Sequence, residues 1–206
     1  MDGSEVSAAA GSASPENVVH AFTFTAGAEV GMRLLNTSGG TGERACDLLA
    51  ADGQTAAKLP EGIKFGSDCS LSGTLAAITE KSSRYEYQVR VRYQDGGVVD
   101  ESMVLVVNPP IRMDVSNVQV TAGGRLDAPL QVVRVSGGSG AIRASLFESD
   151  GKTPAILPEG LRFNEINGTL EGKIPLVAME KKCVIKAVDQ GGGSIERAFT
   201  LKVNAR

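Results

Sequence analysis

The sequence predicts an all-β protein made of two tandem β-sandwiches, and three observations support this prediction. The segment Leu-Pro-Glu-Gly-Ile-Lys-Phe at 59–65 returns as Leu-Pro-Glu-Gly-Leu-Arg-Phe at 157–163. Stretches in which apolar and polar residues alternate flank both copies, with Gly, Ser and Asp turn signals between them. No stretch keeps a helical period. A repeat of this length indicates a domain duplication, and many short alternating strands are typical of a β-sandwich.

Other landmarks repeat at nearly the same offset, and they set the expected domain boundaries. The matched segments are Thr-Ala-Gly at 25–27 and 121–123, Ser-Gly-Gly at 38–40 and 136–138, and Val-Asn at 107–108 and 203–204. We expect a disordered lead at 1–16, a first sandwich at 17–108, a linker at 109–113 and a second sandwich at 114–206. Each sandwich should have seven or eight strands, and the two should superpose.

The last two strands of each copy have the clearest pattern. From Arg84 to Gln94, Tyr and Val alternate with polar residues, and a turn at 94–97 precedes a second apolar row. This pattern predicts a half-buried hairpin. The second copy repeats it around a Gly-Gly-Gly turn at 191–193. Shorter strands are expected upstream, at 22–24, 32–35 and 46–49 in the first copy and at 118–120, 130–135 and 142–147 in the second.

The repeated motif has a physical explanation as a crossing between two sheets. Proline restricts the chain after the leucine, and Gly62 or Gly160 permits a tight turn. The apolar residue and the phenylalanine that follow should enter the core. Phe65 and Phe163 are therefore predicted to occupy equivalent buried positions.

Pro109 and Pro110 separate the two copies. Proline lacks a backbone donor and restricts its neighbours, so the last strand of the first copy must end there. We expect a short, semi-rigid linker and an extended two-domain rod. Ile111 and Met113 follow closely, and we expect them to form a small contact between the domains rather than to belong wholly to the second core.

The charge of the chain disfavours some classes of partner. The 206 residues carry 21 basic and 24 acidic side chains, interspersed, for a formal net charge of −3. This balance argues against nucleic acid and anionic membrane surfaces as partners, and no apolar run is long enough to insert across a bilayer. The N-terminus lacks the pattern of a secretion signal, so the chain as printed is expected to stay in the cytosol. A fragment of a longer protein with an upstream signal is the alternative.

Three cysteines, Cys46, Cys69 and Cys183, stand at positions that the duplication does not repeat. We expect free thiols that are buried or half-buried, with a Cys46–Cys69 disulfide in the first domain as the alternative. The cysteines do not have the spacing of a zinc site.

Catalytic motifs are weak. His20 is the one histidine, and we interpret it as an ordinary residue of the first strand rather than part of a nucleophilic triad. Gly-Lys-Thr at 151–153 is reminiscent of a phosphate-binding loop, but Leu146 stands where the first glycine should be and Pro154 where a helix should begin. The glycines at 137–140 predict a turn. We therefore predict no catalytic residue and no enzyme.

The order of these features resembles a known family. A Ser-Gly-Gly turn, the Leu-Pro-Glu-Gly motif, a Leu-x-Gly step at 71–73 or 170–172 and two alternating strands that end in Val-Asn are similar to immunoglobulin (Ig)-like modules related to dystroglycan-type cadherin-like domains. The resemblance covers about residues 20–206. It implies tandem Ig-like β-sandwiches in cell-surface or secreted proteins, acting as spacers or as adhesive and ligand-binding surfaces, sometimes with calcium.

Calcium is the one cofactor that this resemblance raises. A site would need about six to eight oxygen ligands, whereas the expected junction offers Asn108 and Asp114 without an acidic cluster. Asp189 stands at the family's late-strand acidic position, and Tyr93 replaces it in the first copy. We predict no metal and no cofactor, with an interdomain calcium ion or a weak site near Asp189 as alternatives.

The sequence favours a non-enzymatic structural and interaction module, a spacer or protein-binding surface in a larger surface or scaffold protein. An adhesin for a carbohydrate or protein ligand is one alternative, although sugar sites usually recruit aromatics and this chain has 4% aromatic residues and no Trp. An intracellular cytoskeletal or ciliary scaffold is the other, which the missing signal and the unpaired cysteines favour. The resemblance implies a cell-surface or extracellular location, and two glycosylation sequons in predicted turns, at Asn36 and Asn167, agree with it.

Overall fold

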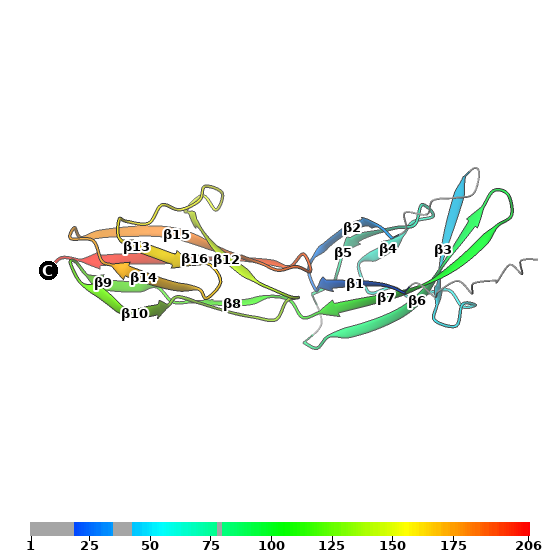
Figure 1. The fold of residues 1–206 in the computed structure, drawn as a ribbon, viewed down its shortest axis with the longest axis horizontal. Coiled ribbons are helices and arrows are strands. Elements are labelled where there is room, and N and C mark those ends of the chain that lie inside the picture. The colour runs from blue at the N-terminus through cyan, green and yellow to red at the C-terminus, as the bar shows by residue number, and fades with distance from the viewer. Residues whose placement is uncertain (1–18, 35–42, 78–79) are drawn as a thin grey trace, which may run out of the picture.

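A computed structural model describes residues 19–34, 43–77 and 80–206. Figure 1 shows two β-sandwiches placed end to end along the long axis of the molecule. The regular elements of the described residues are strands, so the prediction of an all-β protein with two tandem Ig-like sandwiches is confirmed. The lead at 1–16 lies outside the described residues, and the domain boundaries stay a prediction. None of the described residues forms a helix with the length and apolar character needed to span a membrane.

Two sheets form the first sandwich. Its strands are β1 (Val19–Thr25), β2 (Glu29–Arg33), β3 (Arg44–Ala50), β4 (Ile63–Phe65), β5 (Ser70–Thr74), β6 (Ser83–Tyr93) and β7 (Val98–Asn108). One sheet has the order β1-β7-β6-β3 and the other has the order β2-β5-β4. β1 runs parallel to β7, whereas β6 pairs with β7 and β3 in antiparallel fashion.

The second sandwich repeats this layout and adds a two-stranded ribbon. Its strands are β8 (Arg112–Val115), β9 (Val118–Thr121), β10 (Arg125–Gln131), β11 (Val133–Ser136), β12 (Arg143–Glu148), β13 (Leu161–Asn164), β14 (Thr169–Lys173), β15 (Met179–Val188) and β16 (Ser194–Asn204). The sheets have the orders β12-β15-β16-β9 and β10-β14-β13, and β11 pairs with β8. The predicted single strand at 130–135 is divided at Val132, where the chain leaves one sheet for the ribbon. Nine strands are therefore described here instead of seven or eight.

The predicted alternation determines which side chains form the two cores. Tyr87, Val89 and Val91 on β6 are at most 5% exposed, and the equivalent Cys183 and Ile185 on β15 are at most 2% exposed. The residues between them face the other side of the sheet, since successive strand residues point to opposite faces. Each sandwich has its own buried apolar cluster.

The repeated motif forms a tight turn where two backbones approach closely. The N–H of Ile63 donates to the carbonyl of Pro60 at 3.2 Å, and Gly62 between them has a φ of +89°. This is the arrangement of a type II turn, which favours glycine at its third position. A Cβ on Gly62 would lie 1.9 Å from the carbonyl oxygen of Thr74. The second copy repeats the turn at Gly160, with a φ of +91°.

The two phenylalanines of the motif occupy equivalent positions but are less buried than predicted. Phe65 and Phe163 are half-buried and pack against their cores from the edge. Ile63 and Leu161, two residues earlier, are buried, at 8% and 6% exposed. The aliphatic residue of the motif is therefore the deeper anchor. The two residues are two positions apart and face the same side of the strand, but the phenylalanine lies near the end of the short β4 or β13.

Ile111 and Met113 belong to the second core, which corrects the expectation that they form a contact between the domains. They are 6% and 5% exposed and lie in the buried cluster of the second sandwich. Met113 is on β8, and β8 begins two residues after Pro110. Pairing of β8 with β11 therefore draws this segment into the second sandwich.

Cys46 and Cys69 form a disulfide, with Cα atoms 5.2 Å apart. The expectation of free thiols is therefore wrong for these two residues. Cys46 lies on β3 of the four-stranded sheet and Cys69 lies just before β5 of the three-stranded sheet, so the bond links the two sheets. Cys183 is free and buried, as expected, and its burial raises the pKa of the thiol.

Candidate functional site

Buried polar side chains gather where the two sandwiches meet. Thr25 ends β1 and Asn108 ends β7, and the two residues are partners in the parallel pairing of these strands. From the second sandwich, Ser139 lies in the turn between β11 and β12, and Asp189 directly follows β15. Thr25 is 0% exposed and Ser139 is 3% exposed. Polar groups buried to this extent need hydrogen-bond partners.

Hydrogen bonds across the junction supply those partners. Thr25 Oγ1 lies 2.5 Å from Asp189 Oδ2 and 2.8 Å from Ser139 Oγ. A hydroxyl has one proton and a carboxylate only accepts, so the proton of Thr25 goes to Asp189. Asn108 Nδ2 donates to Ser139 Oγ at 2.9 Å. The backbone N–H of Thr25 also donates to the carbonyl of Gly191 at 3.0 Å.

Asp189 also organises the turns of its own sandwich. Its Oδ2 accepts from the backbone N–H of Ser139 at 2.7 Å, and its Oδ1 accepts from the backbone N–H of Gly193 at 2.7 Å. The carboxylate thus holds two loops of the second sandwich at the place where they contact Thr25. Asp189 therefore fixes the loops at this end of the second sandwich and also makes the contact with Thr25 of the first sandwich.

The glycines at 191–193 allow the sandwiches to approach each other. A Cβ on Gly191 would lie 2.7 Å from Thr25 Oγ1, and a Cβ on Gly193 would lie 2.7 Å from Thr25 Cγ2. Side chains at these positions would push the two sandwiches apart. The equivalent turn of the first sandwich has open space around Gly96 and carries Asp95 in place of a glycine.

Asp189 is also the residue that the family resemblance associates with calcium. Its two oxygens accept three hydrogen bonds from the protein itself. Within the described ranges, no group of three or more His, Cys, Asp or Glu side chains is placed to hold a metal ion. The lack of a metal cofactor stays a prediction.

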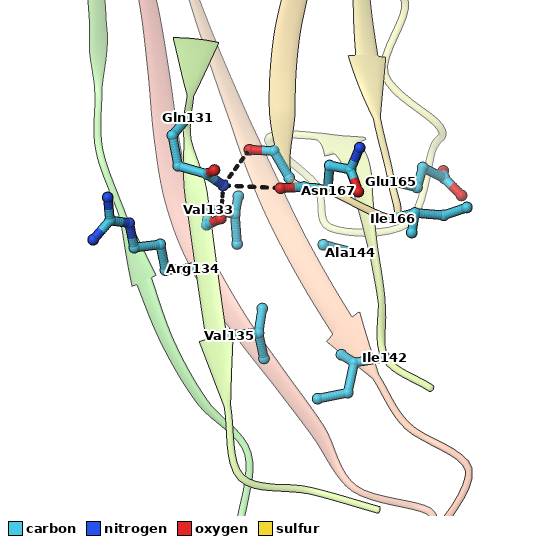
Figure 2. Close-up of a pocket in the computed structure, with 10 residues that line it drawn as sticks. Gln131, Val133, Arg134, Val135, Ile142, Ala144, Glu165, Ile166 and Asn167 are labelled. Carbon is cyan, nitrogen blue, oxygen red and sulfur yellow. Dashed lines mark hydrogen bonds between the residues drawn. The ribbon is translucent and has the colours of Figure 1, made fainter. Parts of the chain in front are cut away.

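A second feature of this sandwich is a cavity of about 430 Å³ between β11 and β12. Figure 2 shows Val135 and Ile142 across the opening from each other, with Gln131 at one end. Gln131 Nε2 donates to the carbonyl of Asn167 at 2.8 Å, so the protein itself uses this amide. Ile166, which also lines the cavity, is 78% exposed. The cavity is therefore open, and its lining combines apolar side chains with the charged Arg134 and Glu165.

The other candidate residues lie outside the junction network. His20 is on β1, as expected, and its Nε2 lies 2.6 Å from Oε2 of Glu101 on β7. Asn167 is exposed in the turn between β13 and β14, as its sequon requires. Asn36, the other sequon, lies outside the described residues.

Sequence reasoning missed Thr25 and Ser139. Both are short polar residues near predicted turns, where exposure is the ordinary expectation. One signal was available in the turn at 191–193, because three consecutive glycines exceed what a hairpin requires and indicate a close backbone approach. Asp189 was singled out, although for a metal rather than for the junction.

No protein-family model matches the chain, and the curated proteins give no match either. Among solved structures, it is similar to an I-band fragment of titin, with 14% identity, a TM-score of 0.48, and coverage of 91% of this chain and 63% of that one. It is also similar to extracellular domains 3–5 of Drosophila OTK, with 16% identity, a TM-score of 0.45, and coverage of 90% and 59%. For the fibronectin(III)-like modules of Clostridium thermocellum CbhA, the identity is 13%, the TM-score 0.44, and the coverage 91% of both chains.

This chain spans less than two thirds of the titin and OTK fragments. Similarity at this level of identity carries no argument about activity or partners.

Proposed function

We propose that the chain is a non-enzymatic structural module, whose two Ig-like sandwiches keep a fixed mutual orientation and so space or present a protein-binding surface within a larger protein. The observation that carries this proposal is the buried network of Thr25, Ser139 and Asp189 across the junction. The hydrogen bonds of this network form only when both sandwiches supply their residues in one mutual orientation. Two freely swinging sandwiches would not keep these bonds.

The energetics of the network favour one tilt over others. A tilt that kept the sandwiches in contact but broke the network would leave a buried polar group unpaired, at a cost of about 1–3 kcal/mol. Such a cost corresponds to a preference of about 5-fold to 150-fold for the bonded orientation. Pro109 and Pro110 act in the same direction, because they limit the conformations of the connection.

We further propose an extracellular or cell-surface location. The supporting observation is the Cys46–Cys69 disulfide, since such bonds persist in oxidising compartments and are rare in the cytosol. The disulfide favours a surface protein over an intracellular scaffold, because the scaffold interpretation relied partly on unpaired cysteines. The finer resemblance, to dystroglycan-type cadherin-like modules, belongs to the same proposal and depends on the order of the sequence motifs.

Small-angle scattering of the whole chain tests the spacer role. We expect an elongated particle with a narrow distance distribution. Thr25→Val keeps the volume of the side chain but removes the bridging hydroxyl, and glycines in place of Pro109 and Pro110 remove the stiffness of the connection. Each change should broaden the distribution. Thr121→Val, at the equivalent exposed position of the second sandwich, is the matched control. A broad distribution in the unmodified chain would contradict the proposal.

A ligand-binding adhesin is the second candidate, and the cavity between β11 and β12 favours it. Among the described residues, no aromatic side chain lines this cavity, whereas Val135, Ile142 and Ile166 line it together with the charged Arg134 and Glu165. A lining of apolar and charged side chains without an aromatic ring suits a segment of a protein better than a carbohydrate. A glycan array distinguishes the two ligand classes, and specific glycan binding lost in Ile142→Asp would contradict the preference for protein.

A further inference from the structure

The free end of the second sandwich repeats the end of the first sandwich that forms the junction. Thr25 pairs with Asn108 in the parallel pairing of β1 and β7. Thr121 pairs with Asn204 in the parallel pairing of β9 and β16. The same two residue types therefore end the same two strands in both sandwiches.

The backbone behind these pairs also corresponds. Two backbone hydrogen bonds of the first sandwich each have a counterpart in the second. In the first sandwich, the N–H of Ala26 donates to the carbonyl of Asn108 (2.8 Å) and that of Gly27 to the carbonyl of Leu75 (2.9 Å). In the second, the N–H of Ala122 donates to the carbonyl of Asn204 (3.0 Å) and that of Gly123 to the carbonyl of Pro175 (3.0 Å). The two ends thus present the threonine and the asparagine from the same backbone arrangement.

The two ends differ in what covers them. Thr25 is 0% exposed beneath the second sandwich, whereas Thr121 is exposed. Beside it, Leu176 is 84% exposed and Val177 is 73% exposed. A Cβ on Gly123 would lie 3.1 Å from Leu176 Cδ2, so this leucine lies over the same turn. Large apolar side chains exposed together beside polar groups are typical of an interaction surface.

We propose that this end of the second sandwich, formed by Thr121, Asn204 and Leu176, is a docking surface for one end of a further β-sandwich tethered closely after Asn204. The docking end carries an acidic residue and a glycine turn, as Asp189 and the glycines at 191–193 do at the existing junction. The carboxylate of the docking end accepts from the hydroxyl of Thr121. Its glycine turn lies against Thr121 as the turn at 191–193 lies against Thr25, and Leu176 packs against the docking end. The inference rests on the proposed spacer role, because it extends the same junction by one unit.

A second copy of this chain does not have the required end. The docking end of its second sandwich is already covered by its own first sandwich. At the corresponding end of the first sandwich, the N–H of Tyr93 donates to the carbonyl of Gly97 at 2.9 Å, just as the N–H of Asp189 donates to that of Gly193 at 3.1 Å. Tyr93 thus replaces the acidic residue, and Asp95 adds a side chain to the turn. The existing junction forms between two sandwiches that the chain itself tethers, which favours a tethered partner over a free one.

A three-sandwich chain tests the inference. Residues 109–206 are added again directly after Asn204, so that Asn204 precedes two prolines as Asn108 does. Scattering of the original chain reports on the first junction alone, and scattering of the longer chain adds the second. We expect a narrow distance distribution in both, and amide exchange at Thr121 and Ala122 should slow in the longer chain.

Two variants identify the surface. Thr121→Val and Leu176→Asp should each broaden the distribution of the three-sandwich chain and restore fast amide exchange, while neither changes the scattering of the original chain. Val98→Asp, an exposed valine on the first sandwich, is the matched control and should change neither chain. A narrow distance distribution for the original chain with a broad one for the three-sandwich chain would overturn this inference alone. Unchanged amide exchange in the longer chain would do the same. A broad original chain would overturn the spacer role as well.

Discussion

The hydroxyl of Thr25 donates a hydrogen bond of 2.5 Å to the carboxylate of Asp189, which follows it by 164 residues in the chain. The contact joins the last residue of β1 in one sandwich to the residue after β15 in the other. Thr25 has a counterpart in Thr121, whereas the counterpart of Asp189 is Tyr93. The threonine of the junction therefore occurs in both copies, whereas the acidic residue occurs in the second copy alone. The two sandwiches can thus form this contact in one order along the chain and not in the reverse order.

Gly191→Ala is expected to disrupt the junction. The added Cβ would lie 2.6 Å from Ser139 Oγ and 2.7 Å from Thr25 Oγ1, so the sandwiches must separate or change their tilt. We expect a cost of about 1–3 kcal/mol, as for other overpacked sites, together with a broader distance distribution in scattering. Gly31→Ala, where nothing lies within 4 Å of the new Cβ, is the control and should leave the tilt intact. Equal effects of the two variants would refute the steric role of Gly191.

Phe199→Ala should destabilise the second sandwich more than Phe163→Ala. Phe199 is 1% exposed, and loss of a fully buried Phe costs about 3–5 kcal/mol. Phe163 is half-buried at the margin of the core, so less apolar area returns to water when it is removed. Chemical unfolding followed by circular dichroism measures both costs. A Phe163→Ala cost equal to that of Phe199→Ala would show that the motif anchors the core more deeply than its exposure indicates.

The strands and the duplication could be predicted because their signals are local. The alternation along β6 and β15 and the glycine of the type II turn at Gly62 each depend on a few neighbouring residues. The division of 130–135 into two strands was missed, although the adjacent Val132 and Val133 break the alternation there. Both valines are buried, as expected where a chain passes from one sheet to the other.

The glycines at 191–193 signal a close backbone approach, but the residues that they approach could not be predicted, because the junction depends on distances between residues far apart in the chain. The residues near Thr25 do not indicate that it is buried. The same Thr-Ala-Gly segment recurs at 121–123, and there the threonine, Thr121, is exposed. Ile111 and Met113 were misplaced for a related reason. Their closeness to the prolines suggested an interface, whereas pairing of β8 with β11 decides their position.

Reduction of the Cys46–Cys69 disulfide should destabilise the first sandwich and leave the second one nearly unchanged. The bond closes a loop with a sequence separation of 23, for which the expected loss is about 3 kcal/mol. Unfolding with and without dithiothreitol measures the effect, and the second sandwich serves as the internal control because its one cysteine is free. Two reactive thiols in the folded, untreated chain would contradict the disulfide. Cys183 should react only after unfolding, because it is 2% exposed and burial raises its thiol pKa.

Stability should fall in acid through two equivalent aspartates that close exposed turns. The pKa of Asp52 is lowered from its ordinary value of 3.8, chiefly by the backbone N–H of Thr55. The pKa of Asp150 is lowered in the same way, chiefly by the hydroxyl of Thr153. This bonding also explains the Gly-Lys-Thr segment at 151–153 as part of a turn rather than a phosphate-binding loop.

The sign of the effect follows from the direction of these shifts. Below 3.8 the unfolded chain takes up protons on Asp150 before the folded chain does, so the stabilisation is complete above that pH and is lost as the pH falls through the folded value. Asp150→Asn should therefore lower the free energy of unfolding at neutral pH, with a difference from the unmodified chain that shrinks below pH 3.8. Chemical unfolding at several pH values measures it. Asp127→Asn, an exposed residue on β10, is the control, and a difference for Asp150→Asn that stays constant with pH would show that its carboxylate does not stabilise the turn.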